Sequence, residues 1–198
     1  MSRNLALFDF DGTITRKDTF LVFIRYCVGD TRYAMGFLVL SPVLVMYKLK
    51  LIPNWRAKEI VFSYFFKGVS DEQFKTWGKA FAEKVIPGLI RPSALKAIQD
   101  HRAKSDRVIV VTASSSAWIK GWTDSLGLEL LATEWAIDKD GITGRLTGKN
   151  CYGMEKRNRI VNHLDLKEYP VISVYGDTSG DKEMLELGTH RHYRFFTD

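Results

Sequence analysis

The chain has 198 residues, of which 45% are hydrophobic and 26% are charged, and its formal net charge is +6 at pH 7. This length and composition exclude a disordered chain and predict a globular protein with one good core and room for an inserted subdomain. The two cysteines have no metal-type spacing, and the first apolar run already contains two aspartates. We therefore expect no secretory signal peptide and a location in the reducing cytoplasm.

The first predicted element is a buried strand that ends at Asp9 and Asp11, in the sequence ALFDFDGTIT. A carboxylate at the end of a buried strand costs free energy unless it is paired, hydrogen-bonded or bound to a metal. Asp11-Gly12 is also a common hairpin signal, but residues 13–27 soon space their apolar side chains as a helix does. The pattern therefore favours a catalytic or metal site over a hairpin.

The next segment, residues 16–60, combines most of the positive charge with a long apolar run. It holds eight basic and three acidic side chains, an excess of 8 − 3 = +5. Residues 33–47 carry no charge at all, which is not typical of a nucleic-acid groove, so we expect no nucleic-acid partner. The run is shorter than the roughly 20 residues of a spanning helix, and Pro42 interrupts it. Two interpretations stay open: a buried helical pair, or a kinked element in the interface of an anionic membrane.

After two further helices expected between residues 60 and 86, apolar strands alternate with helices. The continuous apolar runs RVIVVTA and YPVISVYG suit a parallel sheet that is covered on both faces. Between them, residues 138–153 have the turn signals of a hairpin. We expect an α/β fold, a Rossmann-like parallel sheet with an inserted all-helical cap. Residues 1–15 and 88–198 would form the core domain, and residues 16–87 would form the cap.

Polar residues follow three of the predicted strands. Because the carboxyl ends of parallel strands meet at one edge of a sheet, we expect these residues to share one site. For Ser114 and Asp181, a helix N-cap is the competing interpretation. In chain order, the strand-end residues are Asp9 and Asp11, then Thr112, Ala113 and Ser114, then Asp177 and Asp181.

The motifs DFDGT, VVTAS, GMEKRNRI with Lys156, and GDTSGD follow one another along the chain. In this order they resemble the haloacid dehalogenase superfamily over the whole α/β domain. The position of the helical insert resembles subfamily IB, which has a C1-type cap and includes phosphoserine phosphatase. DGTITRKDTF, NCYGMEKRNRI and the apolar cap further resemble bacterial phosphatases of the phosphatidylglycerophosphatase C type. The resemblance implies a phosphatase that acts on phosphate monoesters.

The chemistry of the two strand-end aspartates agrees with that expectation. Asp9 is placed to attack phosphorus and form an aspartyl phosphate, and Asp11 to protonate the leaving oxygen and then activate water. The cation that these carboxylates need would be Mg²⁺, which prefers oxygen ligands. Asp9 and Asp177 would supply carboxylates, and the resemblance implies the backbone carbonyl of Asp11 as a further ligand. Asp181 would act through a metal-bound water.

The remaining motif residues would handle phosphate and substrate. Thr112 and the amide of Ala113 would hold phosphate oxygens, and Lys156 would neutralise charge near the nucleophile, although a solvated helix position is the competing interpretation for Lys156. Asp18 stands where phosphoserine phosphatases have a Glu that recognises the substrate amino group, which argues against phosphoserine itself. Asp18 and Ser114 are candidate substrate contacts.

Three functions follow as alternatives. The first is a phosphatase for a phospholipid headgroup such as that of phosphatidylglycerophosphate, with the cap in peripheral contact with an anionic membrane at its inner face. The second is a soluble phosphomonoesterase of the phosphoserine phosphatase type, which acts on a phosphorylated small molecule. The third is a non-catalytic receiver that accepts phosphate on aspartate, and the long helical insert argues against it.

Overall fold

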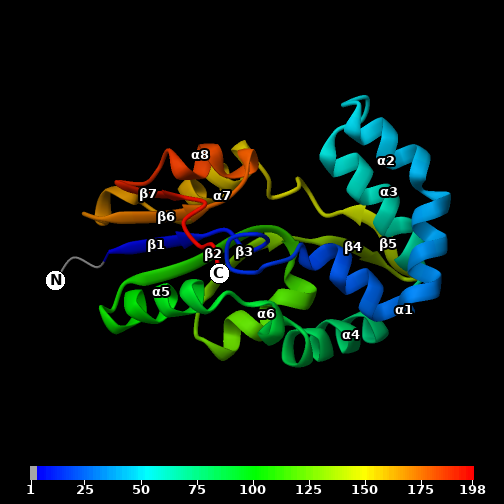
Figure 1. Cartoon of the computed structure of the whole chain (residues 1–198), viewed down its shortest axis with the longest axis horizontal. Helices are drawn as coiled ribbons and strands as arrows, with labels where there is room; N and C mark the ends of the chain where they lie inside the picture. The colour runs from blue at the N-terminus through cyan, green and yellow to red at the C-terminus, as the bar shows by residue number, and fades with distance from the viewer. Residues whose placement is uncertain (1–3) are drawn as a thin grey trace.

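The computed structural model describes residues 4–198, and a five-stranded parallel sheet forms its centre (Figure 1). The strand order is β3-β2-β1-β6-β7, and all four neighbouring pairs are parallel. The predicted α/β fold with a Rossmann-like sheet is therefore confirmed. The strands are β1 (Leu5–Phe8), β2 (Arg107–Ser115), β3 (Glu129–Thr133), β6 (Ile172–Gly176) and β7 (His190–Tyr193).

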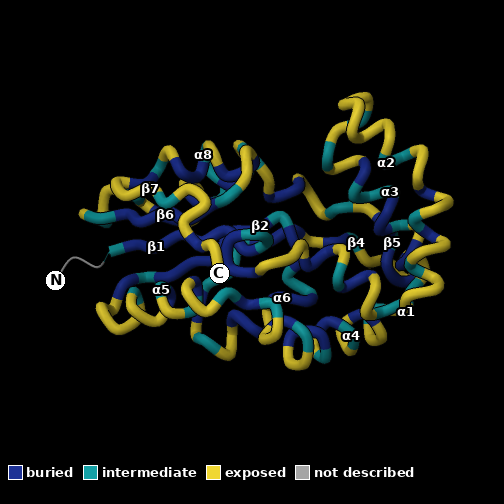
Figure 2. The backbone as a smooth tube through the Cα atoms, viewed as in Figure 1, coloured by how far each residue is buried: buried dark blue, intermediate teal, exposed yellow. Residues whose placement is uncertain are grey.

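Helices cover both faces of the sheet, which explains why its central strands are apolar without interruption. Along β1, Ala6 and Phe8 face one hydrophobic cluster and Leu5 and Leu7 face the other. Figure 2 shows the central strands as buried. The helices on the first face are α5 (Pro92–Ala103) and α6 (Ser116–Ser125); those on the second are α7 (Met154–His163) and α8 (Lys182–Leu185). Short 3₁₀ turns lie at η1 (Ile86–Leu89), η2 (Leu166–Glu168) and η3 (Ser179–Asp181).

The segment between β1 and η1 is helical, and a kink at Gly29 bends its first helix. Ser70 caps the fourth helix by accepting a hydrogen bond from the amide of Gln73. The boundaries expected for the core domain (residues 1–15 and 88–198) and for the cap (residues 16–87) stay a prediction. Residues 1–3 of the expected core domain lie outside the described residues. The helices of this segment are α1 (Thr19–Val39), α2 (Ser41–Lys48), α3 (Asn54–Phe66) and α4 (Asp71–Lys84).

The inserted helices pack on two elements that come later in the chain. The hairpin predicted over residues 138–153 forms earlier in the chain, as β4 (Trp135–Asp138) and β5 (Gly141–Leu146). It lies against α3, where a side chain at Gly144 would collide with Ser63. Helix α4 lies against α6 so closely that a Cβ at Gly78 would stand 1.9 Å from the carbonyl oxygen of Ala117. The insert is therefore anchored to the α/β domain from two sides.

The apolar run of residues 33–47 forms the end of α1 and most of α2, with Pro42 in the first turn of α2. The interpretation of this run as a buried helical pair holds for one face only. Gly36 and Leu40 are buried, and Tyr33, Phe37, Val43 and Leu44 pack against the core, whereas Leu38 is 76% exposed. Hydrophobic periodicity cannot distinguish a helix face that meets a neighbour from one that meets solvent. Among residues 4–198, no helix combines the length and the apolar composition needed to cross a membrane.

Candidate active site

The carboxyl ends of β1, β2 and β6 meet at one edge of the sheet and bring the predicted site residues together. The amide of Asp9 donates a hydrogen bond to the carbonyl of Tyr175 over 2.9 Å, which continues the pairing of β1 with β6 to the site itself. Asp9 is buried, and so is Asp181 in the turn after β6. The topology of the sheet therefore places residues more than 160 positions apart in the sequence side by side.

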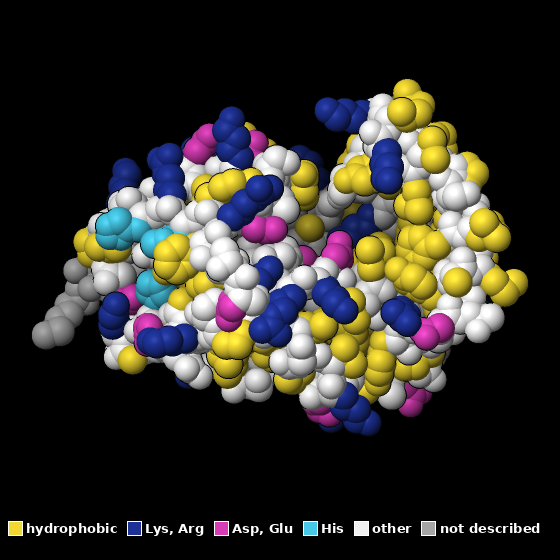
Figure 3. Space-filling view, viewed as in Figure 1, with side chains coloured by type: hydrophobic (Ala, Val, Ile, Leu, Met, Phe, Trp, Pro, Cys, Tyr) yellow, Lys and Arg dark blue, Asp and Glu magenta, His cyan; other side chains and the backbone are white. Residues whose placement is uncertain are grey.

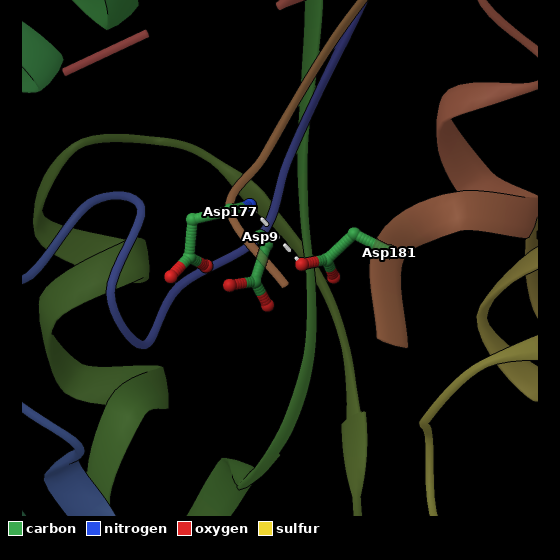
Figure 4. A group of neighbouring side chains, drawn as sticks. All are labelled: Asp9, Asp177 and Asp181. Carbon is green, nitrogen blue, oxygen red and sulfur yellow. Dashed lines mark hydrogen bonds between the residues drawn. The ribbon is translucent and has the colours of Figure 1, made fainter. Parts of the chain in front are cut away.

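Three carboxylates form the centre of the site. Asp9, Asp177 and Asp181 each offer an oxygen within 4.8 Å of the others, and their side chains converge on one space in Figure 4. Gly12 leaves room for this cluster, because a Cβ there would stand 2.4 Å from a carboxylate oxygen of Asp177. Gly12 also has a φ of +87°, which glycine adopts without strain. The DGT motif thus combines a carboxylate with the glycine that accommodates a second one.

Hydrogen bonds from nearby groups fix the orientation of two of these carboxylates. The hydroxyl of Thr13 donates to Asp177 over 3.0 Å. Asp181 accepts from the amide and the hydroxyl of Thr178, both over 2.9 Å, which forms a capping box at η3. Asp181 is the N3 residue of this box, whose N-cap is Thr178, and its side chain does not cap α8, so the N-cap interpretation is wrong. Its other oxygen accepts from Lys156, and its role toward a metal stays a prediction.

Lys156 reaches this cluster from α7 and is only 2% exposed. Its Nζ donates to Oδ1 of Asp9 and, over 2.6 Å, to Oδ1 of Asp181. Burial alone would lower the pKa of Lys156, but the two carboxylates raise it above its ordinary value, so the ammonium stays charged. The interpretation of Lys156 as a solvated helix residue is wrong.

The cluster fits a divalent cation. Burial raises the pKa of Asp9 and, to a smaller extent, that of Asp177, which means that their charged forms are short of positive charge even beside Lys156. A cation bound to the three carboxylate oxygens would stabilise those charged forms. Oxygen ligands of this kind suit a hard ion such as Mg²⁺ or Ca²⁺.

Asp11 lies on the other side of the site and is oriented by the start of α1. Its Oδ1 accepts from the amide and the hydroxyl of Thr19, both over 2.6 Å. Its Oδ2 accepts from the hydroxyl of Ser114 over 2.6 Å and from that of Thr112 over 3.4 Å. The helix cap is Ser115 instead of Ser114, so the Ser114 hydroxyl is free to hold Asp11. Sequence reasoning did not identify Thr19.

A second basic side chain enters the site from α3 and was also missed. Lys58 donates to the carbonyl of Ala113 over 2.5 Å and lies over the ring of Phe20 at 5.1 Å. Burial lowers the pKa of Lys58, although Asp18 and Asp11 oppose the effect. In the sequence it is one of several lysines in a basic segment, and no local pattern distinguishes it.

Asp18, a candidate substrate contact, caps α1 by accepting from the amide of Phe20 over 2.9 Å. Asp18 is exposed, but desolvation by the surrounding protein, followed by the charge of Asp11, raises its pKa to about 6. The register of β2 against β3 shifts between Thr112 and Ser115, so the strand is irregular where Ala113 lines the site. The roles predicted for Thr112, Ala113 and Asp18 toward phosphate and substrate stay predictions.

A cavity of about 530 Å³ extends from the carboxylates to the inserted helices. One end is polar and includes Asp9, Asp11 and Lys156. The other end is formed by α1, α2 and α3, and Figure 3 shows the surface hollowed between these helices and the sheet domain. Its apolar wall consists of Phe20, Leu21, Tyr33, Phe37, Leu44 and Tyr47. The cavity can therefore hold a polar group at the carboxylates and an apolar group beside the helices.

Known proteins resemble the chain over nearly its whole length. The sequence profile of haloacid dehalogenase-like hydrolases matches residues 6–186. Protein CicA of Caulobacter vibrioides is 37% identical over 196 residues, which cover 97% of this chain and 86% of CicA. A protein of unknown function from Bordetella pertussis Tohama I has a TM-score of 0.81 at 23% identity, over 96% of this chain and 88% of its own. A phospho-aspartyl intermediate analogue of phosphoserine phosphatase has a TM-score of 0.61 at 16% identity, over 95% of this chain and 84% of its own. The two solved structures show a shared fold.

Proposed function

Because the chain belongs to the haloacid dehalogenase-like hydrolase family, we propose that it is a Mg²⁺-dependent phosphatase that hydrolyses a phosphate monoester through an aspartyl phosphate. The observation that carries the proposal is the position of Asp9, a buried carboxylate that lines the polar end of the cavity and lies beside Lys156 and two further aspartates. A nucleophile, a fixed cation and a set of metal ligands thus occur within one small site. The phospho-aspartyl analogue of phosphoserine phosphatase has the same fold, which supports this chemistry.

In the proposed reaction, a carboxylate oxygen of Asp9 attacks phosphorus, and the bond from phosphorus to the ester oxygen breaks. Asp11 gives its proton to the departing oxygen and later takes a proton from the water that attacks the aspartyl phosphate. That second attack releases inorganic phosphate and restores the Asp9 carboxylate. Thr19 and Ser114 hold the Asp11 carboxyl group in place for both proton transfers.

Mg²⁺ would be held by Asp9 and Asp177, with Asp181 beside it, and would neutralise charge on the phosphate. Lys156 keeps its own positive charge next to the nucleophile, which lowers the repulsion between Asp9 and an anionic substrate. Lys58 extends the positive charge toward the group that leaves. The protein would therefore bind the phosphate at the carboxylate end of the cavity.

The apolar wall of the cavity favours a substrate with an apolar part, such as a lipid whose headgroup ends in a phosphate monoester. A phosphatidylglycerophosphate-like lipid fits this description, and the resemblance to phosphatidylglycerophosphatase C-type enzymes agrees with it. The alternative is a soluble phosphomonoester of the phosphoserine type, for which an apolar wall has no evident use. A non-catalytic receiver would accept phosphate without releasing it continuously.

A phosphate-release screen tests the proposal. We expect steady release of inorganic phosphate with Mg²⁺ and loss of that release with a chelator, with restoration when Mg²⁺ is added back. Lipid phosphates in micelles should have a kcat/KM about tenfold or more above that of soluble esters, because the apolar wall contributes binding. A single turnover without continued release would favour the receiver, and preference for soluble esters would exclude the lipid substrate.

The role of Asp11 gives a separate prediction. Asp11→Asn should slow esters with poor leaving groups by about 10² to 10⁴, and activated aryl phosphates much less, because a good leaving group needs little protonation. Ser116→Ala, at an exposed hydroxyl paired with Glu134, is a suitable control and should change neither rate. Equal losses on both kinds of ester would contradict the assignment of Asp11 as the acid.

A further inference from the structure

The outer surface of the inserted helices is apolar and exposed. It belongs to the end of α1, to α2 and to the turn before α3, which together form the part of the insert remote from the sheet (Figure 1). We call this surface the apolar tip: Met35, Leu38, Val39, Val45, Leu49 and Leu51. Leu38 is 76% exposed, Leu51 69% and Val45 54%. A cluster of this kind on one short stretch is typical of a surface that meets a partner.

Positive charge flanks the apolar tip along the chain. No acidic residue occurs between Asp30 and Glu59, whereas five basic residues do. Four of them are exposed, and we call them the basic rim: Arg32, Lys48, Lys50 and Arg56. Of these, Arg56 also pairs with Glu59 over 3.2 Å. Exposed Trp55 and Tyr47 lie in the same stretch, and these residue types are enriched where protein meets the lipid headgroup region. The surface is therefore complementary in charge to an anionic partner and in polarity to an apolar one.

The same helices that carry the apolar tip also form the apolar wall of the cavity. On α1, Phe37 lines the cavity and its neighbour Leu38 faces outward; on α2, Leu44 lines the cavity and its neighbour Val45 faces outward. Figure 3 shows hydrophobic side chains gathered over the inserted helices. A layer only one helix thick thus separates the cavity from the outer apolar surface.

We propose that the apolar tip and its basic rim dock on the surface of an anionic lipid bilayer. The apolar side chains enter the boundary between headgroups and acyl chains, and the basic side chains lie among the anionic headgroups. This surface contact needs no spanning helix. It goes beyond the proposed catalysis and does not depend on it, since no residue of the tip or the rim belongs to the carboxylate site.

Vesicle co-sedimentation tests the docking surface. The wild-type protein should bind vesicles of phosphatidylcholine with phosphatidylglycerol about tenfold more than vesicles of phosphatidylcholine alone, and high salt should reduce the difference. Leu38→Glu should lower the binding about tenfold, because it places a charge in the inserted surface. Val161→Glu is the matched control, at an exposed apolar position on α7, and should bind as the wild type does.

The basic rim needs its own control. Lys48→Gln with Lys50→Gln should remove most of the preference for anionic vesicles, whereas Lys104→Gln with Lys167→Gln, which lowers the net charge equally at exposed positions of the α/β domain, should keep it. The Asp9→Asn protein should bind vesicles normally, so a failure of docking and a failure of the proposed chemistry give different results.

The proposal is overturned if the wild type does not bind anionic vesicles at low salt or if Leu38→Glu and Val161→Glu bind alike. It is also overturned if the wild type sediments as a dimer that Leu38→Glu dissociates, because the tip would then be covered by a second copy.

Discussion

Replacing Asp9 by asparagine should lower the rate of phosphate release by about 10⁴-fold or more, because the amide cannot attack phosphorus. The fold should survive the change. Asparagine has nearly the same shape, it can still accept a hydrogen bond from Lys156, and Lys156 keeps its partner Asp181. The thermal unfolding transition should therefore stay within a few degrees of the wild-type value, which separates a chemical defect from a structural one.

Mass spectrometry gives an independent measurement of the same step. After rapid acid quenching during turnover, the wild-type peptide that contains Asp9 should carry one added phosphate, and the Asp9→Asn peptide should carry none. Asp140→Asn is the matched control, since Asp140 is exposed on the hairpin turn and its variant should keep full activity. Normal turnover by the Asp9→Asn protein, or phosphate found on another aspartate, would overturn Asp9 as the nucleophile.

The second large effect concerns stability. Lys156→Met should lower the free energy of unfolding by about 3 to 5 kcal/mol, because it leaves the buried carboxylates of Asp9 and Asp181 without their cation. For a chain of this length, such a loss lowers the melting temperature by roughly 10 °C. The side chain is almost fully buried, so solvent does not screen the interaction as it would at the surface. Phosphate release should also fall, since the charge beside the nucleophile is gone.

An exposed lysine provides the comparison. Lys120 pairs with Asp124 one turn along α6, but both side chains are more than half exposed, and Lys120→Met should change the free energy of unfolding by about 0.5 kcal/mol or less. Chemical denaturation of both variants, with and without Mg²⁺, separates the effect of losing the buried lysine from that of losing the exposed one. Added Mg²⁺ should recover part of the stability of Lys156→Met, because it supplies positive charge to the same carboxylates. Equal stability of the two variants would show that Lys156 is not essential to the buried cluster.

Much of the fold followed from local sequence pattern. The apolar runs around Val110 and Val174 predicted a parallel sheet. The turn signals within residues 138–153 predicted a hairpin, which forms with its turn there but spans Trp135 to Leu146. These features are decided by neighbours within a few positions, so a single sequence contains the information. The position of the strand-end aspartates also followed from the sequence, because the direction of a strand sets which edge of the sheet its last residues reach.

Other features were decided only by tertiary packing. The sequence determined that Asp9, Asp11, Lys156 and Asp181 occur in motifs, but not that Lys156 is buried between two carboxylates while Asp11 turns toward Thr19. Lys58 reaches the site because α3 lies over the end of β2, a contact between segments 55 positions apart. Residues 33–47 have the composition of a core, and yet only one side of them packs on the core and the cavity. The other side is exposed, because nothing within the described chain packs over the outer side of α1 and α2. The sequence by itself therefore determined the parallel sheet and the types of residue at its edge, and the tertiary structure decided their partners and their burial, since both depend on long-range packing that no local pattern encodes.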